Sequence, residues 1–155
     1  LDQQLTALER RAKDPSRVAL LKNLVERATD GNAKMFLHQQ ALKCRRENPD
    51  LFTLGKYVPL QVAGSQAEHV FAFARIHNNM QAIVIVPRLI ASLVPGGQAP
   101  VSDSVWMDAA VLLPEELRGN GWRDVLADEA RGLSGDRLHV GQALAHFPVS
   151  LWRRR

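Results

Sequence analysis

The side chains that could do acid–base or metal chemistry in this chain include five histidines. They are His38, His69, His77, His139 and His146. The sequence has no HExxH pattern among these histidines, and with one cysteine it has no CxxC pair. These are common arrangements of residues that bind a zinc ion. His139 and His146 stand seven apart across a predicted strand-to-turn region, which is a weak grouping. We therefore expect no metal site and no cofactor.

Acidic side chains occur in three close pairs. The pairs are Asp103 and Asp108 on either side of Trp106, Asp124 and Asp128 near a predicted strand end, and Glu115 and Glu116 after Pro114. A retaining glycosidase needs two carboxyl groups about 5 Å apart, and an inverting enzyme needs a wider separation. Each pair is equally typical of a solvated turn, so the sequence predicts no catalytic residue and leaves any substrate-binding residue unknown.

Nucleophilic catalysis and phosphate binding lack their usual patterns. Ser92, Ser102 and Ser104 flank or lie in a loop rich in proline and glycine, without a GxSxG motif, and Gly96–Gly97 is an isolated pair. Cys44 is the only cysteine, so no intrachain disulfide can form and a reducing cytoplasm is the expected location. Because Cys44 falls in an apolar helical stripe, we expect a buried, inert thiol.

Three tryptophans could stack on sugar rings or fill a core. We expect Trp122 and Trp152 in the core, because aromatic side chains bury the most area per residue, and leave Trp106 open between the two roles.

The net charge of +4 and the pI near 9.7 raise the question of nucleic-acid binding. Arg153, Arg154 and Arg155 supply three of these charges, and we interpret them as a solvated tail. The longest apolar run, residues 82–87, is too short to span a bilayer. We therefore expect neither a nucleic-acid partner nor a membrane partner.

The elements that would position these residues begin with helices over residues 1–48. Apolar residues recur every three or four positions in three stripes. The stripes are Leu1, Leu5, Leu8 and Ala12; Val18, Leu21, Val25 and Ala28; and Ala33, Phe36, Leu37, Ala41 and Cys44. Asp14–Pro15 and Asp30 predict the starts of the second and third helices, and Asn48–Pro49 predicts the end of the third.

After Pro49 the apolar period changes to two, which is typical of strands. Residues 55–62 predict an edge strand because Pro59 cannot donate a ladder hydrogen bond. Residues 69–76 and 80–86 predict a hairpin that turns at Asn78 and Asn79, and residues 95–104 predict a loop. Further strands are expected at 110–113, 122–126, 138–140 and 147–152, with one helical turn at 142–146. The predicted fold class is α+β: about three N-terminal helices (1–48), then an antiparallel β-sandwich domain (49–155).

Six segments occur in an order that resembles the C-terminal end of maltooligosyltrehalose synthase, in the α-amylase superfamily (glycoside hydrolase family 13). They are "DGNAKMFLHQQALKCRRENPDLF", "GKYVPLQV", "EHVFAFAR", "AIVIVPRL", "WRDVLADE" and "HFPVSLW"; a tryptophan–aspartate stretch follows the loop. They run from about Asp30 to Trp152. The family pattern differs at that stretch: we expect a glycine and a threonine around the aspartate, where this chain has Met107–Asp108–Ala109.

The resemblance implies an enzyme that converts the reducing-end α-1,4 linkage of a maltooligosaccharide to an α,α-1,1 linkage in trehalose biosynthesis. Its catalytic aspartates and glutamate would lie in a (β/α)8 barrel. Because no barrel motif occurs here and residue 1 is Leu, we expect this chain to be an inactive fragment of a longer polypeptide. Its expected partners are the missing barrel, the maltooligosaccharide bound by the parent enzyme, and maltooligosyltrehalose trehalohydrolase in the pathway. Homodimers through exposed helix faces are also expected.

Two alternatives remain open. A stand-alone carbohydrate-binding β-module would use Trp106 and neighbouring aromatic residues. A nucleic-acid binder would use the positive charge and would bind with a steep dependence on salt.

Overall fold

The computed structural model describes Thr6 and residues 17–155, and it has an α+β fold in which helices precede antiparallel sheets. The first helices are α2 (Arg17–Glu26), α3 (Asn32–Glu47) and α4 (Pro49–Thr53), with a short 3-10 turn η1 (Ala28–Asp30) between the first two. The helix expected over residues 1–12 and the start expected at Asp14–Pro15 lie outside the described residues. None of the helices described is long and apolar enough to cross a membrane.

The buried stripes of α2 and α3 differ in part from those expected. In α2 the buried residues are Leu20, Leu21 and Leu24, so Leu21 is predicted correctly whereas Ala28 lies exposed in η1. In α3 the buried residues are Phe36, Gln40 and Cys44, spaced four apart on one side of the helix. Phe36 and Cys44 were expected to be buried, whereas the other expected members, Ala33, Leu37 and Ala41, are only half-buried. Gln40 was not expected in this stripe, and its side chain accepts a hydrogen bond from Arg17 Nη2 (3.3 Å).

The two ends of α3 lie close to their predicted positions. At the start, Asp30 Oδ1 accepts a hydrogen bond from the Asn32 backbone N–H (2.8 Å), although Gly31 is the N-cap residue. At the other end, α3 stops at Glu47 as predicted, and buried Asn48 donates its Nδ2 to the Cys44 carbonyl oxygen (2.8 Å). The helix α4 that follows was not predicted; Pro49 occupies its first turn, where a missing N–H has no cost.

The larger sheet has six strands in the order β1-β3-β4-β9-β6-β7. Their bounds are β1 Lys56–Pro59, β3 Val70–His77, β4 Met80–Pro87, β6 Gly119–Asp124, β7 Ala130–Leu133 and β9 Ser150–Arg154. The predicted hairpin is confirmed: His77 pairs with Met80, and Asn78 has the positive φ of 53° that its tight turn requires. The predicted edge position of Pro59 is also confirmed, because β1 pairs only with β3.

The smaller sheet has three strands, β2 (Val62–Ala63), β5 (Ala110–Leu112) and β8 (Arg137–His139), in the order β2-β5-β8. The single strand expected over 55–62 is therefore divided between the two sheets. Strand β7 was not predicted, whereas β5, β6, β8 and β9 overlap the expected strands. Short helices complete the chain: η2 Ala67–His69, η3 Ile90–Ser92, α5 Asp103–Trp106, η4 Glu115–Leu117 and α6 Val140–Ala143.

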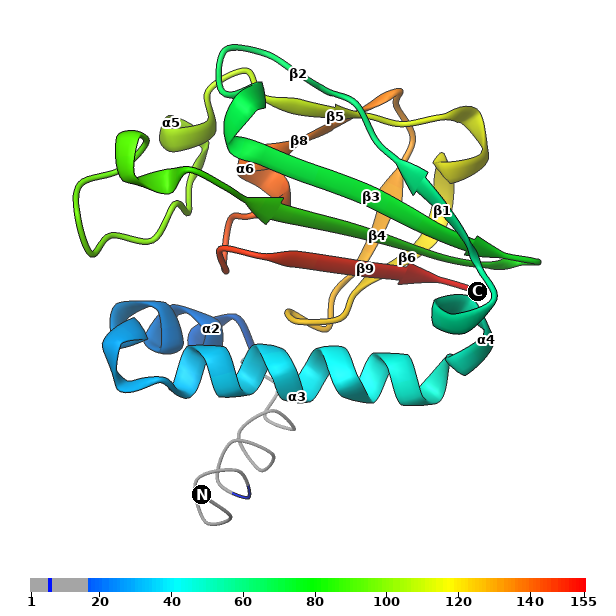
Figure 1. Cartoon of the computed structure of the whole chain (residues 1–155), viewed down its shortest axis with the longest axis horizontal. Helices are drawn as coiled ribbons and strands as arrows, with labels where there is room; N and C mark the ends of the chain where they lie inside the picture. Colours follow the sequence, from blue (N-terminus) through cyan, green and yellow to red (C-terminus); the bar gives the residue numbers. More distant parts are fainter. Residues whose placement is uncertain (1–5, 7–16) are drawn as a thin grey trace.

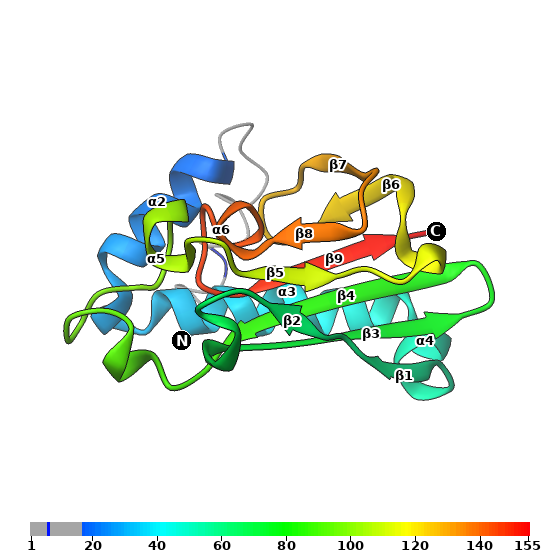
Figure 2. The ribbon, with the colours of Figure 1, turned by 90° about the horizontal axis from the view of Figure 1, so that it is seen from above.

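Three layers follow from this arrangement. The larger sheet lies between the smaller sheet on one side and α3 on the other (Figures 1 and 2). Along β3, Ala72 and Ala74 point into a core shared by both sheets, and Phe73 and Arg75 point to the opposite face. There Arg75 Nη2 donates to the Phe52 carbonyl oxygen of α4 (2.8 Å).

A second core joins the helices to the β part of the chain. Its buried members are Leu20, Leu21, Leu24, Phe36, Leu126, Ala127 and Phe147. The rings of Phe36 and Phe147 lie 6.3 Å apart between centroids. The helical segment therefore packs directly on the loops that flank β6 and β9.

The interpretation of the last arginines as a solvated tail is wrong. Arg153 and Arg154 belong to β9, where they pair with Ala82 and Gln81 of β4. The Arg154 side chain donates to the carbonyl oxygens of Glu116 and Arg118 (both 2.7 Å) and to Gln81, and it lies over the Trp122 ring. Its positive charge is thus part of the fold.

Candidate functional site

The carboxylates singled out in the sequence have partners in the fold itself. Asp108 Oδ1 accepts hydrogen bonds from the Ser65 hydroxyl (2.6 Å) and backbone N–H (2.9 Å), and these bonds lower the pKa of Asp108. Asp103 packs so closely on Gly141 of α6 that a Cβ there would lie 2.2 Å from Asp103 Oδ1. Glu115 and Glu116 differ, because both are exposed at the start of η4 and, with Pro114, line a surface pocket of about 460 Å³.

Asp124 and Asp128 also have separate partners. Asp124 is buried and accepts the backbone N–H groups of Leu126 (2.8 Å) and Ala127 (3.0 Å), while its burial raises its pKa. Asp128 pairs with Arg123 (2.7 Å), which lowers the pKa of Asp128. These contacts fit a turn at the end of β6, and they give the two carboxylates no shared task.

Metal and thiol chemistry find no site in the described part of the chain. Among the described residues, no group of three or more His, Cys, Asp or Glu side chains could hold a metal ion. Cys44 is buried, as predicted, and burial raises the pKa of its thiol. His69 is buried at the end of η2, with Nε2 3.7 Å from Glu68 Oε1.

All three tryptophans belong to the core. The prediction for Trp122 and Trp152 is confirmed, since they are 0% and 1% exposed. Trp106 is also 0% exposed, and its Nε1 donates to the Pro100 carbonyl oxygen (2.8 Å). Trp106 therefore cannot stack on a sugar, and the carbohydrate-binding alternative loses the residue on which it depended.

A different set of aromatic rings is exposed, on β1 and β3. Tyr57 and Phe71 are each 46% exposed, and half-buried Phe73 lies between them, with ring centroids 5.2 Å from Tyr57 and 5.9 Å from Phe71. Sequence reasoning missed this group. The signal was the alternation of Phe71 and Phe73 on one face of a strand beside an edge strand that carries Tyr57.

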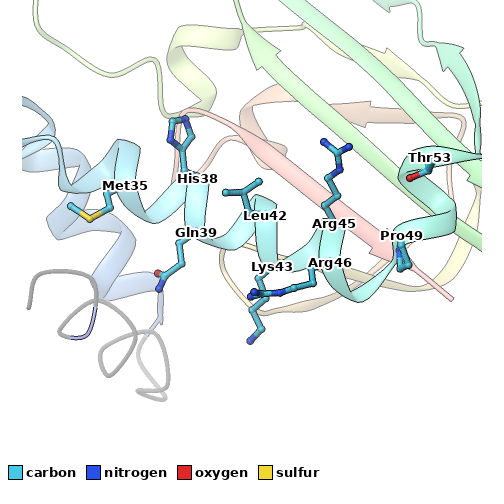
Figure 3. Close-up of a pocket in the computed structure, with 9 residues that line it drawn as sticks. All are labelled: Met35, His38, Gln39, Leu42, Lys43, Arg45, Arg46, Pro49 and Thr53. Carbon is cyan, nitrogen blue, oxygen red and sulfur yellow. The ribbon is translucent and has the colours of Figure 1, made fainter. Parts of the chain in front are cut away.

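A surface groove of about 750 Å³ lies along α3 (Figure 3). The described residues that line it are Met35, His38, Gln39, Leu42, Lys43, Arg45, Arg46, Pro49 and Thr53. Of the α3 members, His38, Leu42, Lys43, Arg45 and Arg46 are exposed, whereas Met35 and Gln39 are half-buried. Met35 also packs against the second core. In Figure 3 the side chains of His38, Leu42 and Arg45 point to one side of the helix, and those of Gln39, Lys43 and Arg46 point to the other.

The groove combines exposed apolar surface with positive charge. Leu42 is 64% exposed. A larger apolar surface that is exposed on a protein often marks a site where another molecule binds. Lys43, Arg45 and Arg46 supply three cations at the carboxyl end of α3, where they also complement the helix dipole. Neither Leu42 nor these three cations were among the candidate site residues predicted from the sequence.

The sequence matches no protein-family model, and no curated protein matches it. Two surface features of the described residues expose apolar side chains: the α3 groove and the aromatic rings of β1 and β3. Both suit binding to another molecule better than bond-breaking chemistry, because neither brings a nucleophile or an acid–base pair to a cleft.

Proposed function

We propose that this chain is the C-terminal region of a maltooligosyltrehalose synthase of the α-amylase superfamily, glycoside hydrolase family 13. In this proposal α3 ends the helical part of the parent enzyme, and the two sheets are its C-terminal β-sandwich domain. The observation that carries the proposal is the order of elements: the segments of the resemblance fall on α3, on the central strands β3 and β4, and on β6 and β9.

The backbone at residue 107 gives independent support. Met107 has φ 51° and ψ −117°, and the Ala109 N–H donates to the Trp106 carbonyl oxygen (2.9 Å). These angles belong to the first central position of a type II′ turn, which glycine occupies without strain. The family pattern has glycine at this position, so its backbone preference agrees with the turn found in this chain.

The proposed role of the region is structural. The parent enzyme would convert the reducing-end α-1,4 linkage of a maltooligosaccharide to an α,α-1,1 linkage, and its carboxylates would act from a barrel in the cytoplasm. This region would stabilise that barrel and would contribute no catalytic residue. Its product would then pass to maltooligosyltrehalose trehalohydrolase.

Antibodies raised against this chain allow a direct test on the natural gene product. We expect them to capture a polypeptide several times larger than 17.2 kDa that forms maltooligosyltrehalose, a non-reducing saccharide, from maltopentaose. The purified 155-residue chain should form none under the same conditions. Capture of a 17.2 kDa product, or of a larger one without this activity, contradicts the proposal.

A stand-alone carbohydrate-binding module is the second candidate, favoured by the exposed rings of Tyr57, Phe71 and Phe73. It predicts that maltooligosaccharides shift the NMR signals of these rings and that Tyr57→Ala weakens binding. Tryptophan fluorescence is a poor reporter here because all three tryptophans are buried. Unchanged ring signals at high saccharide concentration count against this candidate.

A further inference from the structure

We propose that the α3 groove is a docking site for an acidic amphipathic α-helix of a protein partner. Apolar side chains of that helix would lie against Met35, Leu42 and Pro49, and its carboxylates would pair with the cations beside them. The inference goes beyond the proposed function, because it concerns the chemistry of the partner. It holds whether the docking helix belongs to the same parent polypeptide or to another protein.

The spacing of the lining residues indicates a helix as the occupant. Met35, Leu42 and Pro49 follow one another at intervals of seven residues. Met35 and Leu42 are nearly two helical turns apart on α3, which is about 10 Å along its axis. Pro49, the first residue of α4, extends the row of apolar lining residues past the end of α3. A second helix with the same apolar repeat can lie along such a row, as in helix-in-groove recognition.

Flanking positions repeat with the same period. His38 and Arg45 are seven apart, as are Gln39 and Arg46. Figure 3 shows His38 and Arg45 on one side of α3 and Gln39 and Arg46 on the other. Positions that flank an apolar row in this way form the ion pairs that select a partner in coiled coils.

The charge of the groove indicates an acidic partner. Lys43, Arg45 and Arg46 line it, and none of its described lining residues carries a carboxylate. Glu47 Oε1 lies 3.9 Å from Lys43 Nζ, so one of the three cations has an acidic neighbour on α3. Complementary charge favours a partner with carboxylates on both sides of its apolar row.

The same charges argue against two other occupants. A second copy of this chain, docked groove to groove about a two-fold axis, would present the same described lining residues, which include no carboxylate to pair with Lys43, Arg45 and Arg46. A single-stranded nucleic acid would gain from stacking on aromatic side chains, and no Phe, Tyr or Trp is among the described residues that line the groove. An amphipathic helix uses both the apolar row and the cations.

The test uses the full chain labelled with nitrogen-15 and a synthetic helical peptide of about three heptads. The peptide carries leucine at its a and d positions and glutamate at e and g, and its control carries glutamine in place of each glutamate. We expect the acidic peptide to shift the amide signals of α3 around Leu42, and calorimetry to show affinity at least tenfold higher than for the glutamine peptide. Higher salt should weaken this binding.

Charge reversal tests the assigned residues. Arg45→Glu/Arg46→Glu should reduce affinity for the acidic peptide at least tenfold, and Leu42→Glu should also reduce it. Arg88→Glu/Arg137→Glu changes the net charge equally at exposed residues outside the groove, and it should leave affinity within about twofold. Circular dichroism confirms that each variant keeps its helices.

Three results overturn the proposal. The first is no shift of α3 amide signals by the acidic peptide. The second is equal loss of affinity in the groove variant and the control variant. The third is preferential binding of an oligonucleotide, or of phosphatidylserine–phosphatidylcholine vesicles, at the same α3 residues, which would assign the groove to nucleic acid or to a lipid surface.

Discussion

At the scale of single residues, Met107 combines an unfavourable backbone with an exposed side chain. Its φ of 51° and ψ of −117° disfavour any residue with a Cβ atom, and its side chain is 64% exposed. We therefore predict that Met107→Gly raises the free energy of unfolding by about 1 kcal/mol. Urea denaturation measures the change.

Met107→Ala is the control for this prediction, because it removes the same side chain and keeps the Cβ atom. It should not stabilise the chain. Equal stabilisation by alanine and glycine would show that the Met107 side chain, rather than its backbone angles, causes the strain.

Asp108 gives a pH-dependent prediction at the same turn. The Ser65 hydroxyl lowers the pKa of Asp108 below its ordinary value of 3.8. A carboxyl with a lowered pKa in the folded state stabilises the fold above its unfolded pKa, and this stabilisation disappears as pH falls through the folded pKa. Ser65→Ala should therefore be less stable than the parent at neutral pH, and the difference should vanish in acid.

Two measurements check the Ser65 prediction. Urea unfolding at several pH values gives the difference in stability, and the NMR titration of the Asp108 carboxyl carbon gives its pKa. The pKa should rise in Ser65→Ala, because the hydroxyl, whose hydrogen bond lowers this pKa most, no longer donates to Asp108. An unchanged titration would show that the hydroxyl does not set this pKa.

At the scale of elements, Asn48 joins α3 to α4. It is 1% exposed, its Nδ2 donates to the Cys44 carbonyl oxygen, and its Oδ1 accepts from Arg155 (3.2 Å). Asn48→Ala leaves buried polar groups without partners, so we predict a loss of about 1–3 kcal/mol in the free energy of unfolding. Thermal denaturation followed by circular dichroism measures it.

Glu47→Ala is the matched control for Asn48→Ala. Glu47 is a neighbour in the sequence, but its side chain is 48% exposed and its pair with Lys43 is on the surface. Its loss should cost less than about 0.5 kcal/mol. Equal effects of the two substitutions would mean that Asn48 does not cap α3.

Elements with strong local patterns could be predicted from the sequence, and elements defined by distant contacts could not. The β3–β4 hairpin was predictable because Asn78 and Asn79 separate two β-rich runs. Strand β7 has the sequence ARGL, without a β-branched or aromatic residue, and it forms through pairing with β6. The division of residues 56–63 between two sheets likewise depends on pairing with β3 and β5.

The same distinction applies to the candidate site. The third helix was predictable from its apolar period, but the side left uncovered was not, because that depends on where the larger sheet and α2 lie. Polar Gln40 is buried and apolar Leu42 is exposed, in contrast to their hydrophobicity. Burial of Trp106 depends on the Pro100 carbonyl oxygen, which the loop brings to its indole N–H.

At the scale of the whole molecule, the helices and the sheets share the core around Phe36. Phe36 is 0% exposed, packs against Phe147, and lies below the guanidinium group of Arg17 (5.9 Å to the ring centroid). Leu126 and Ala127, which follow β6, belong to the same cluster. The helical segment and the β part should therefore unfold together.

Phe36→Ala tests this coupling. Loss of a fully buried phenylalanine should reduce the free energy of unfolding by about 3–5 kcal/mol. Because Phe36 packs in one core with residues of the loops that flank β6 and β9, the transition seen by circular dichroism at the helix band and that seen by tryptophan fluorescence should shift together. Leu42→Ala, on the exposed side of the same helix, should shift neither by more than a few tenths of a kcal/mol. A shift of the helix signal alone would show that α2 and α3 fold independently of the sheets.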